Sequence, residues 1–514
     1  MSRKGSEDLF ILIKTLSKSE KRYFKVFAAQ HAVENTVYIA LFDALVTQKQ
    51  YDEKDILKRE RSIHPKQFHN LKSYLYKLIR KSLRIYHSSK SIEMELKEML
   101  QDVEIFRNKG LYEQCKKILL KAKKTGYKYE KYLQLLEILN WEKKLLQTQG
   151  NTQSSGNGLE NLIREEKLVL EKLDIERKHK DIRLAIFQHY SINNVARNKE
   201  EAEAYRTITD NNLSAQEDSV LTYDAKRDFY YIKSLYYYAV GDLANCYTHQ
   251  KKLLDLLESH PEQLREQLIY YTTALGNYSH VCFLTKRYEE CSHIIEKMRA
   301  IPAKSIRTQI VIFRDSYMRE LELYMGTGEF DKGIALIKNI EQGIHFFKRK
   351  FPSTYIVVLY FNIAYLYFGT GDYSRSVFWL NKIFNDPSLK GSQINHHCFA
   401  QILNLILHFE LGNQDLLESI VKSTYRFLYT RNRLYKFENS VLNFVGKKLL
   451  KIKTHKELIE AFKELKTELE EIIIDRFEKQ ALEYFDFISW LESKIENRPF
   501  AEIVSEKARK RVNN

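Results

Sequence analysis

Two His–Cys pairs in the middle of the chain are the side chains with the clearest potential for chemistry. His280 with Cys282, and Cys291 with His293, would supply two imidazoles and two thiolates, which is a donor set of tetrahedral zinc sites. Residues two apart on a helix point about 200° away from each other, so neither pair converges on one ion. The His-His-Cys run at 396–398 is no better a candidate for a metal site than these two pairs. We therefore expect no metal ion and no other cofactor.

Sequence motifs of known catalytic and phosphate-binding loops are missing. The phrases at 326–328 and 369–371 are both Gly-Thr-Gly, whereas a dinucleotide or kinase loop needs a third glycine and a preceding strand. The chain contains no Gly-x-Ser-x-Gly, His-Glu-x-x-His or Gly-x-x-x-x-Gly-Lys phrase. Adjacent carboxylates, such as those at 200–201 and 470–471, face different directions on a helix. We expect the protein not to be an enzyme.

Large aromatic and sulfur-containing side chains offer a different chemistry, that of binding another protein. In a stacked array of helical hairpins, the first helix of each pair lines the concave surface. Tyr, Phe and Met residues beside the buried stripe of those helices would suit an extended or helical peptide. The alternative is that they pack between neighbouring repeats. The predicted groove consists of Tyr231, Tyr238, His280, Phe283, Met325, Tyr365 and Phe368.

Basic side chains near the N-terminus suit nucleic acid instead. Residues 1–90 contain 19 Lys and Arg against 9 Asp and Glu, and residues 61–90 contain no acidic residue. A helix over 65–86, opened by Pro65, would carry apolar residues on one side and cations on the other. Such a face could lie on phosphates, or it could be the solvated face of an N-terminal capping bundle. Its cations are Lys66, Lys77, Arg80, Lys81 and Arg84.

Regularly spaced turns determine where these candidate residues lie. A glycine or polar turn residue recurs between amphipathic segments, followed two positions later by an aromatic residue or leucine. The turn residues at 241, 286, 328 and 371 are separated by 45, 42 and 43 residues. Gly110 and Gly412 extend the series, and further turns are expected near 154–156, 198–200 and 454–455. This spacing predicts about nine helical hairpins.

Side chains at fixed distances from each turn support paired helices. A small residue comes five positions after the turn residue, where the two helices of a hairpin must approach closely. These small residues are Cys115, Cys246, Cys291, Gly333 and Ser376. Apolar residues nine positions after the turn residue have the spacing of a buried helix face. These are Leu119, Ile295, Ile337 and Leu380.

The segment 360–387 resembles a tetratricopeptide repeat. The matching positions are Ala364, Tyr367, Gly371, Tyr373, Ser376, Leu380 and the closing Pro387. The resemblance extends over about 95–452, with a period near 43 rather than 34 and without the family's initial Trp. It implies an all-α, right-handed superhelical solenoid of helix-turn-helix hairpins with lengthened helices. Only 17 Gly and 6 Pro in 514 residues agree with this, because β-sandwiches and barrels need frequent tight turns.

Three regions follow from these patterns. Residues 1–90 form a basic helical N-terminal region, in which the Ser17-x-x-Glu20 capping box opens a helix and others follow near 37–48 and 52–61. Residues 91–452 form the tetratricopeptide-like repeats. Residues 453–514 form C-terminal capping helices and a basic tail, 507–511, that is expected to fray.

The functional expectation is a non-catalytic scaffold or adaptor that binds another protein on the concave face. The alternative is a nucleic-acid-binding transcriptional regulator with a basic N-terminal domain and a tetratricopeptide-like sensing or dimerisation domain. We find no signal peptide and no apolar stretch long enough to span a membrane. Five scattered cysteines do not form a disulfide framework, so we expect a cytoplasmic protein.

Overall fold

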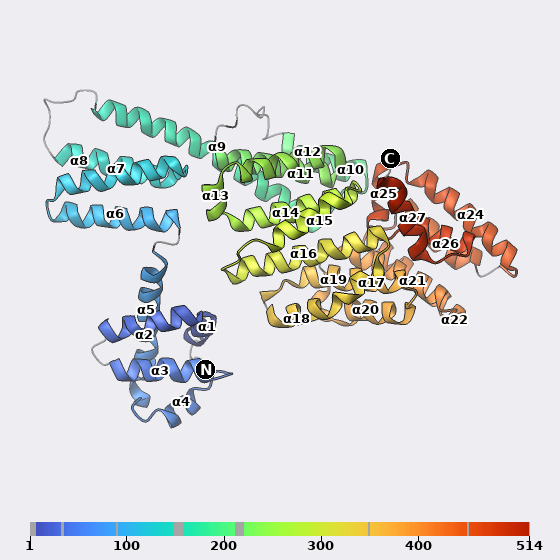
Figure 1. Cartoon of the computed structure of the whole chain (residues 1–514), viewed down its shortest axis with the longest axis horizontal. Helices are drawn as coiled ribbons and strands as arrows, with labels where there is room; N and C mark the ends of the chain where they lie inside the picture. Colours follow the sequence, from blue (N-terminus) through green and yellow to red (C-terminus); the bar gives the residue numbers. More distant parts are fainter. Residues whose placement is uncertain are drawn as a thin grey trace. The chain divides into compact units, whose positions relative to one another are not determined.

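The computed structural model describes residues 7–31, 35–88, 91–148, 158–210, 220, 222–347, 350–391, 393–449 and 452–512. The described residues are predominantly helical and include no strand, which confirms the all-α prediction (Figure 1). The chain divides into two compact units, 1–171 and 172–514. No helix among the described residues has the length and apolar character needed to cross a bilayer.

The first unit begins with a small helical bundle and continues as three further helices. The bundle contains α1 (Asp8–Thr15), α2 (Lys18–His31), α3 (Asn35–Thr47), α4 (Glu53–Arg59), the short 3₁₀ turn η1 (Pro65–Gln67) and α5 (Phe68–His87). The helices that follow are α6 (Ile92–Asn108), α7 (Tyr112–Lys128) and α8 (Tyr132–Thr148). Helix α9 (Gly158–Asn193) begins in the first unit and ends in the second.

Residues predicted to begin helices in the bundle lie at the starts of α2 and α5. The backbone N–H of Glu20 donates to Ser17 Oγ at 3.2 Å, and the backbone N–H of Ser17 donates to Glu20 Oε2 at 2.7 Å, so the predicted capping box is confirmed. Pro65 opens a 3₁₀ turn, and the α-helix itself begins at Phe68. The α5 residues Leu75 and Ile79 are fully buried in the core of the bundle.

The second unit is a succession of helical hairpins followed by a C-terminal segment. The hairpins are built from α10 (Lys199–Asp210), α11 (Tyr223–Ala239), α12 (Leu243–Glu258), α13 (Pro261–Glu266), α14 (Leu268–Leu284), α15 (Tyr288–Arg299), α16 (Ile306–Thr327), α17 (Phe330–Ala335), α18 (Ile337–Phe347), α19 (Ser353–Gly369), α20 (Tyr373–Asn385), α21 (Ile394–Glu410) and α22 (Gln414–Tyr429). A 3₁₀ turn, η4 (Pro387–Leu389), lies between α20 and α21. Consecutive helices pack against each other along the array.

The predicted turn residues, one of them between α6 and α7 of the first unit, follow the first helix of each pair in the left-handed conformation. Gly110, Gly241, Gly328, Gly371 and Gly412 have φ between 73° and 79°, and Lys286 has φ 63°. Glycine is favoured there because it has no Cβ to collide with the preceding turn. The expected turn near 154–156 lies outside the described residues. The one near 198–200 is displaced, since α9 ends at Asn193 and Asn194 takes φ 58°.

Small residues after two of the turns lie where the paired helices touch, as predicted. The Ser376 hydroxyl donates to the carbonyl of Ala364 at 2.6 Å, and the Cys115 thiol donates to the carbonyl of Val103 at 3.5 Å. Gly333 of α17 instead makes room for the next hairpin, since an added Cβ would lie 2.5 Å from Leu366 Cδ2 of α19. Larger side chains at these positions would force the helices apart.

A C-terminal segment packs against the array. It contains α23 (Lys436–Asn443), the π-helical turn η5 (Phe444–Lys448), α24 (His455–Ile472), α25 (Arg476–Lys479), the 3₁₀ turn η7 (Gln480–Glu483), α26 (Phe487–Glu496) and α27 (Phe500–Val512). Helix α27 packs against α16, and α26 packs against α24 and α27 (Figure 1). The surface formed by the first helices of the hairpins, α11, α14, α16, α19 and α21, is called the first-helix face below.

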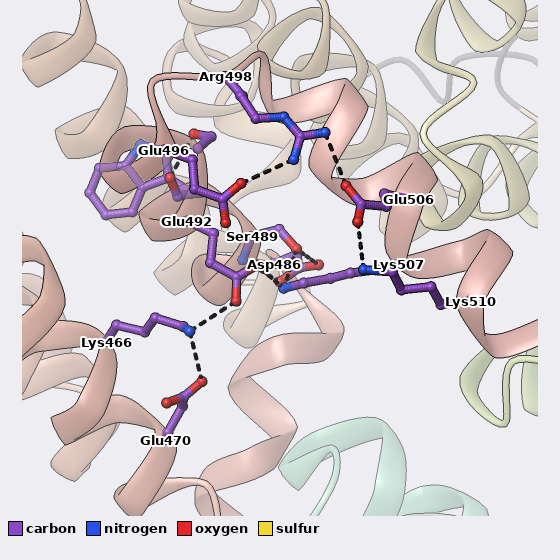
Figure 2. A network of polar contacts seen from close by, with 12 residues as sticks. Lys466, Glu470, Asp486, Ser489, Glu492, Glu496, Arg498, Glu506, Lys507 and Lys510 are labelled. Carbon is purple, nitrogen blue, oxygen red and sulfur yellow. Dashed lines mark hydrogen bonds and ion pairs between the residues drawn. The ribbon is translucent and has the colours of Figure 1, made fainter.

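Ion pairs fasten the last helices to one another (Figure 2). Lys466 of α24 and Lys507 of α27 both reach Glu492 of α26, at 3.0 and 2.6 Å. Arg498, between α26 and α27, pairs with Glu506 at 3.0 Å. Residues 507–511 continue helix α27, in which Lys507 and Lys510 have acidic partners, and the fraying of this tail stays a prediction.

Candidate functional site

The five cations predicted to bind nucleic acid are all exposed on the outer side of η1 and α5. None of them forms an ion pair with a carboxylate in the described part of the chain. Two of them lie over aromatic rings at the outer limit of cation–π contact: the Arg80 guanidinium is 5.8 Å from the Tyr76 ring centre, and Lys81 Nζ is 6.0 Å from that of Phe27. The positive charge of this face is therefore available to an external anion.

The remaining lysine of α5, Lys72, makes its contacts within the bundle. Lys72 is buried and donates to the Tyr51 hydroxyl at 2.9 Å and to Glu53 at 3.2 Å. The polar residues His69, Asn70 and Ser73 are exposed in the first half of α5. Most of the free cations follow in the second half, so the outer side of α5 combines hydrogen-bonding and cationic groups. The structure brings all five predicted cations onto this one surface, called the α5 basic face below.

The predicted groove residues lie on the first-helix face, in two environments. Tyr365, Phe368 and Met325 are buried, with 7, 1 and 7% of their surface exposed. The remaining four, Tyr231, Tyr238, His280 and Phe283, are partly exposed.

The buried pair Tyr365 and Phe368 is covered by the chain's own C-terminal segment. The Phe485 ring lies 5.1 Å from Tyr365 and 4.9 Å from Phe368, and the Phe500 ring lies 5.4 Å from Phe368. The backbone N–H of Asp486 donates to the Tyr365 hydroxyl at 3.1 Å. The role of this pair in binding a partner stays a prediction. In this structure, Phe485 and Phe500 of the same chain cover the surface where a partner would have to bind.

A hydrogen-bonded chain of polar side chains crosses the first-helix face. Arg319 donates to Glu322 Oε2 at 2.5 Å, and the same oxygen lies 3.0 Å from His280 Nδ1. The other ring nitrogen of His280 lies 3.3 Å from the Tyr238 hydroxyl, which donates to Glu483 Oε2 at 3.5 Å. The chain links α16, α14 and α11 to η7, so residues distant in sequence meet here.

Burial perturbs the ionisation of these groups. Desolvation raises the pKa of Glu483 to about 7, against a smaller lowering by the charge of Arg197. Desolvation and the charge of Arg319 lower the pKa of His280, so its imidazole is neutral at pH 7. Burial would raise the pKa of Glu322, but Arg319 and His280 outweigh it and lower the pKa on balance. The cluster thus combines one fixed ion pair with a carboxyl that titrates near neutrality.

The His–Cys pairs diverge, as the helical geometry predicts. Cys282 and Cys291 are buried in the hairpin interior, where Cys291 Sγ lies 3.2 Å from Ser279 Oγ. His280 turns toward Glu322, and His293 is exposed. Burial raises the pKa of the Cys291 thiol to about 11, which disfavours the thiolate that a metal needs. The described residues contain no group of three or more His, Cys, Asp and Glu side chains arranged to hold a metal ion.

Comparison with known proteins finds no family model and no curated sequence that matches this chain. Function is therefore argued from the geometry of these two surfaces.

Sequence reasoning missed Arg319 and Glu483 of this hydrogen-bonded chain, and the contact between His396 and Tyr484. Glu483 and Tyr484 lie in the C-terminal segment, outside the periodic pattern, and no local signal indicates that this segment reaches the first-helix face. His396 was considered only as a metal ligand, and its neutral ring packs 5.1 Å from Tyr484.

Proposed function

We propose that this protein is a non-catalytic, cytoplasmic nucleic-acid-binding regulator that contacts phosphates through the α5 basic face. The observation that carries the proposal is that five exposed cations share one side of η1 and α5 without an ion-pair partner among the described residues. Cations that neutralise phosphates release condensed counterions, which favours binding. The exposed Asn70 and Ser73 add side chains able to hydrogen-bond base edges.

The experiment is a titration of the full chain with a mixed-sequence DNA duplex, and with single strands, at several salt concentrations. We predict that affinity falls steeply with salt and that the combined changes Lys77→Glu, Arg80→Glu, Lys81→Glu and Arg84→Glu abolish binding. If the four cations each contact a phosphate, they account for about 3.6 units of the slope of log K against log salt on a duplex.

A matched control reverses four exposed lysines at similar helical spacing on α7. Lys117→Glu, Lys121→Glu, Lys124→Glu and Lys128→Glu give the same change in net charge at another site of the same unit. This variant should weaken binding much less than the α5 variant. Equal loss in both variants, or no binding of wild type at low salt, would reject a site on α5.

A second candidate function is a protein-binding scaffold, with the array as a right-handed solenoid of about nine tetratricopeptide-like hairpins. It is favoured by the contacts of Phe485 with Tyr365 and of Phe500 with Phe368 of α19. A partner helix that bound to the first-helix face would need aromatic contacts of the same kind. Affinity purification from the native cell, with and without nuclease, separates the two candidates. Partners that survive nuclease treatment support the scaffold, and partners lost with it support nucleic-acid binding.

A further inference from the structure

The outer side of α5 carries one continuous stripe of polar side chains. Its members recur three or four residues apart, so they lie one above another along the helix. The stripe lies about 180° around the helix from the buried side, which is centred on Leu75 and belongs to the core of the bundle. All members of the stripe are exposed, and they are Asn70, Ser73, Lys77, Arg80, Lys81 and Arg84, with Lys66 of η1 one turn earlier.

Two uncharged side chains, Asn70 and Ser73, lie between cations in this stripe. Lys66 precedes them by about one helical turn, and Lys77 follows them by about one turn. In a groove of a nucleic-acid duplex, the base edges likewise lie between the phosphates of the two strands. The order of groups along α5 therefore suits contact with base edges in the middle and with phosphates on either side.

The side chains of Asn70 and Ser73 are available to bond a ligand. Neither side chain forms a hydrogen bond within the described residues. Helical Ser hydroxyls commonly donate to a carbonyl three or four residues earlier, as Ser82 of the same helix does to Ile79 at 3.2 Å. Ser73 does not make this bond, so its hydroxyl and the Asn70 carboxamide both offer donors and acceptors on the outer side of α5.

These groups favour a DNA duplex over other nucleic acids. The major groove of B-DNA is about 12 Å wide and admits an α-helix, and each base pair shows a distinct pattern of donors and acceptors there. The major groove of an RNA duplex is too narrow for side chains to read. Single strands are bound largely by stacking of bases on aromatic rings, and the stripe contains no aromatic residue.

We propose that α5 is a recognition helix that lies in the major groove of duplex DNA and selects a sequence through Asn70 and Ser73. This inference rests on the proposed function, because it requires the α5 basic face to bind nucleic acid. The Asn70 carboxamide accepts a hydrogen bond from adenine N6 and donates one to N7, a pair of groups that only adenine offers in this groove. Ser73 lies about 4.5 Å further along the helix axis and reaches the same or a neighbouring base pair. The cations contact phosphates and supply affinity without selecting sequence.

The experiment selects DNA duplexes with a randomised core on the full chain, and then measures affinity for the selected site and for a scrambled duplex of equal composition. We expect an adenine at one fixed position of the selected site. Asn70→Ala should weaken binding to this site about tenfold and leave the affinity for the scrambled duplex unchanged. Asn70 is exposed and alanine favours helices, so the variant should fold like wild type. Asn108→Ala, which removes an exposed asparagine from α6 of the same unit, is the matched control and should bind like wild type.

Modified bases identify the groove that is contacted. Replacing the selected adenine with 7-deazaadenine removes the N7 acceptor of the major groove, which should weaken binding of wild type but not weaken Asn70→Ala further. Replacing it with 3-deazaadenine removes the N3 acceptor of the minor groove and should leave wild-type binding unchanged. The opposite response to the two bases would reject major-groove contact by Asn70.

The outcomes separate this inference from the proposed function. If the full chain binds no duplex even at low salt, the proposed function fails and the recognition helix fails with it. If duplexes bind but no sequence is enriched, or if Asn70→Ala keeps the sequence preference of wild type, α5 contacts phosphates alone: the recognition helix is rejected and the proposed function stands. Equal or tighter binding of an RNA duplex or a single strand of the selected sequence also rejects it.

Discussion

Three carboxylates of the second unit differ in their partners. Glu438 and Glu478 are buried and share one cation, the Arg197 guanidinium, at 2.9 and 3.8 Å, and Glu478 also accepts the backbone N–H groups of Lys436 and Phe437. Burial raises the pKa of Glu438 in spite of the charge of Arg197. The partly exposed Glu483 has no cation within ion-pair distance among the described residues, and desolvation raises its pKa to about 7. An ionised carboxylate without a cation in such a site costs stability.

We predict that Glu483→Gln stabilises the second unit at high pH. The pKa of Glu483 is raised from 4.5 to about 7 by folding, so the folded state binds the proton more tightly than the unfolded state. The fold is therefore destabilised as pH rises between these two values, by up to about 3 kcal/mol above pH 7. The glutamine variant should gain most of this amount at pH 8 and almost none near pH 4.

The measurement is urea unfolding in a Trp141→Phe background. The remaining tryptophans, Trp379 and Trp490, are buried in the second unit and report its unfolding. Glu496→Gln is the control. A stability difference for Glu483→Gln that does not change with pH would contradict the ionisation assigned to Glu483.

The residue-scale predictions succeeded where a local rule applies. The turn glycines were recognised because a helix end in the left-handed conformation favours Gly, and the same position accepts Lys286 in one hairpin. The divergence of Cys282 and His280 follows equally from helical spacing. Glu483 was not recognised because its partner Tyr238 is 245 residues away in sequence.

At the scale of elements, the turn between α16 and α17 differs from the other hairpin turns. A Cβ added to Gly328 would lie 2.8 Å from the Ala501 carbonyl oxygen and 2.8 Å from the Ser505 backbone nitrogen of α27. The Ser505 hydroxyl also donates to the carbonyl of Thr327 at 3.1 Å. At Gly371, an added Cβ would meet no atom within 4 Å. Both turns require the left-handed conformation, but only the turn at Gly328 contacts α27. Comparing the two positions therefore distinguishes the effect of backbone conformation from the effect of this contact.

We predict that Gly328→Ala destabilises the second unit more than Gly371→Ala does. Both positions have φ near 75–79°, so alanine costs about 1 kcal/mol at either site through backbone strain. The clash with α27 adds about 2 kcal/mol at position 328 alone. Urea unfolding of the two variants in the Trp141→Phe background measures the difference. Equal destabilisation would mean that α27 does not pack on this turn.

Hairpin positions were predictable from sequence, whereas some helix boundaries were not. Helix α9 runs unbroken for 36 residues between the turns expected near 154–156 and 198–200, and it contains no Pro and no Gly after Gly158. The second helix of the α16 hairpin is divided into α17 and α18 near Leu336. Gly333, required for close packing on Leu366, lies in α17 and lowers its helix propensity.

At the scale of the second unit, the start of the array is joined to its C-terminal segment. The Arg433 guanidinium donates to the carbonyl of Asn193 at 3.0 Å, and the Tyr435 hydroxyl donates to Glu201 at 3.3 Å. Together with Arg197 and Glu438, these contacts connect positions about 240 residues apart. The C-terminal segment also covers Tyr365 and Phe368 of the first-helix face through Phe485 and Phe500, whereas the five cations of the α5 basic face are exposed.

Two claims are central: that α26 and α27 pack stably on the array, and that nucleic acid binds to the α5 basic face. Hydrogen exchange of the full chain, with and without a DNA duplex, tests both most directly. We predict that free protein exchanges the amides of α26 and α27 as slowly as those of α19, and that DNA adds protection to peptides covering η1 and α5 and leaves the array unchanged. Rapid exchange of α26 and α27, or protection by DNA on the first-helix face instead of α5, would contradict the account.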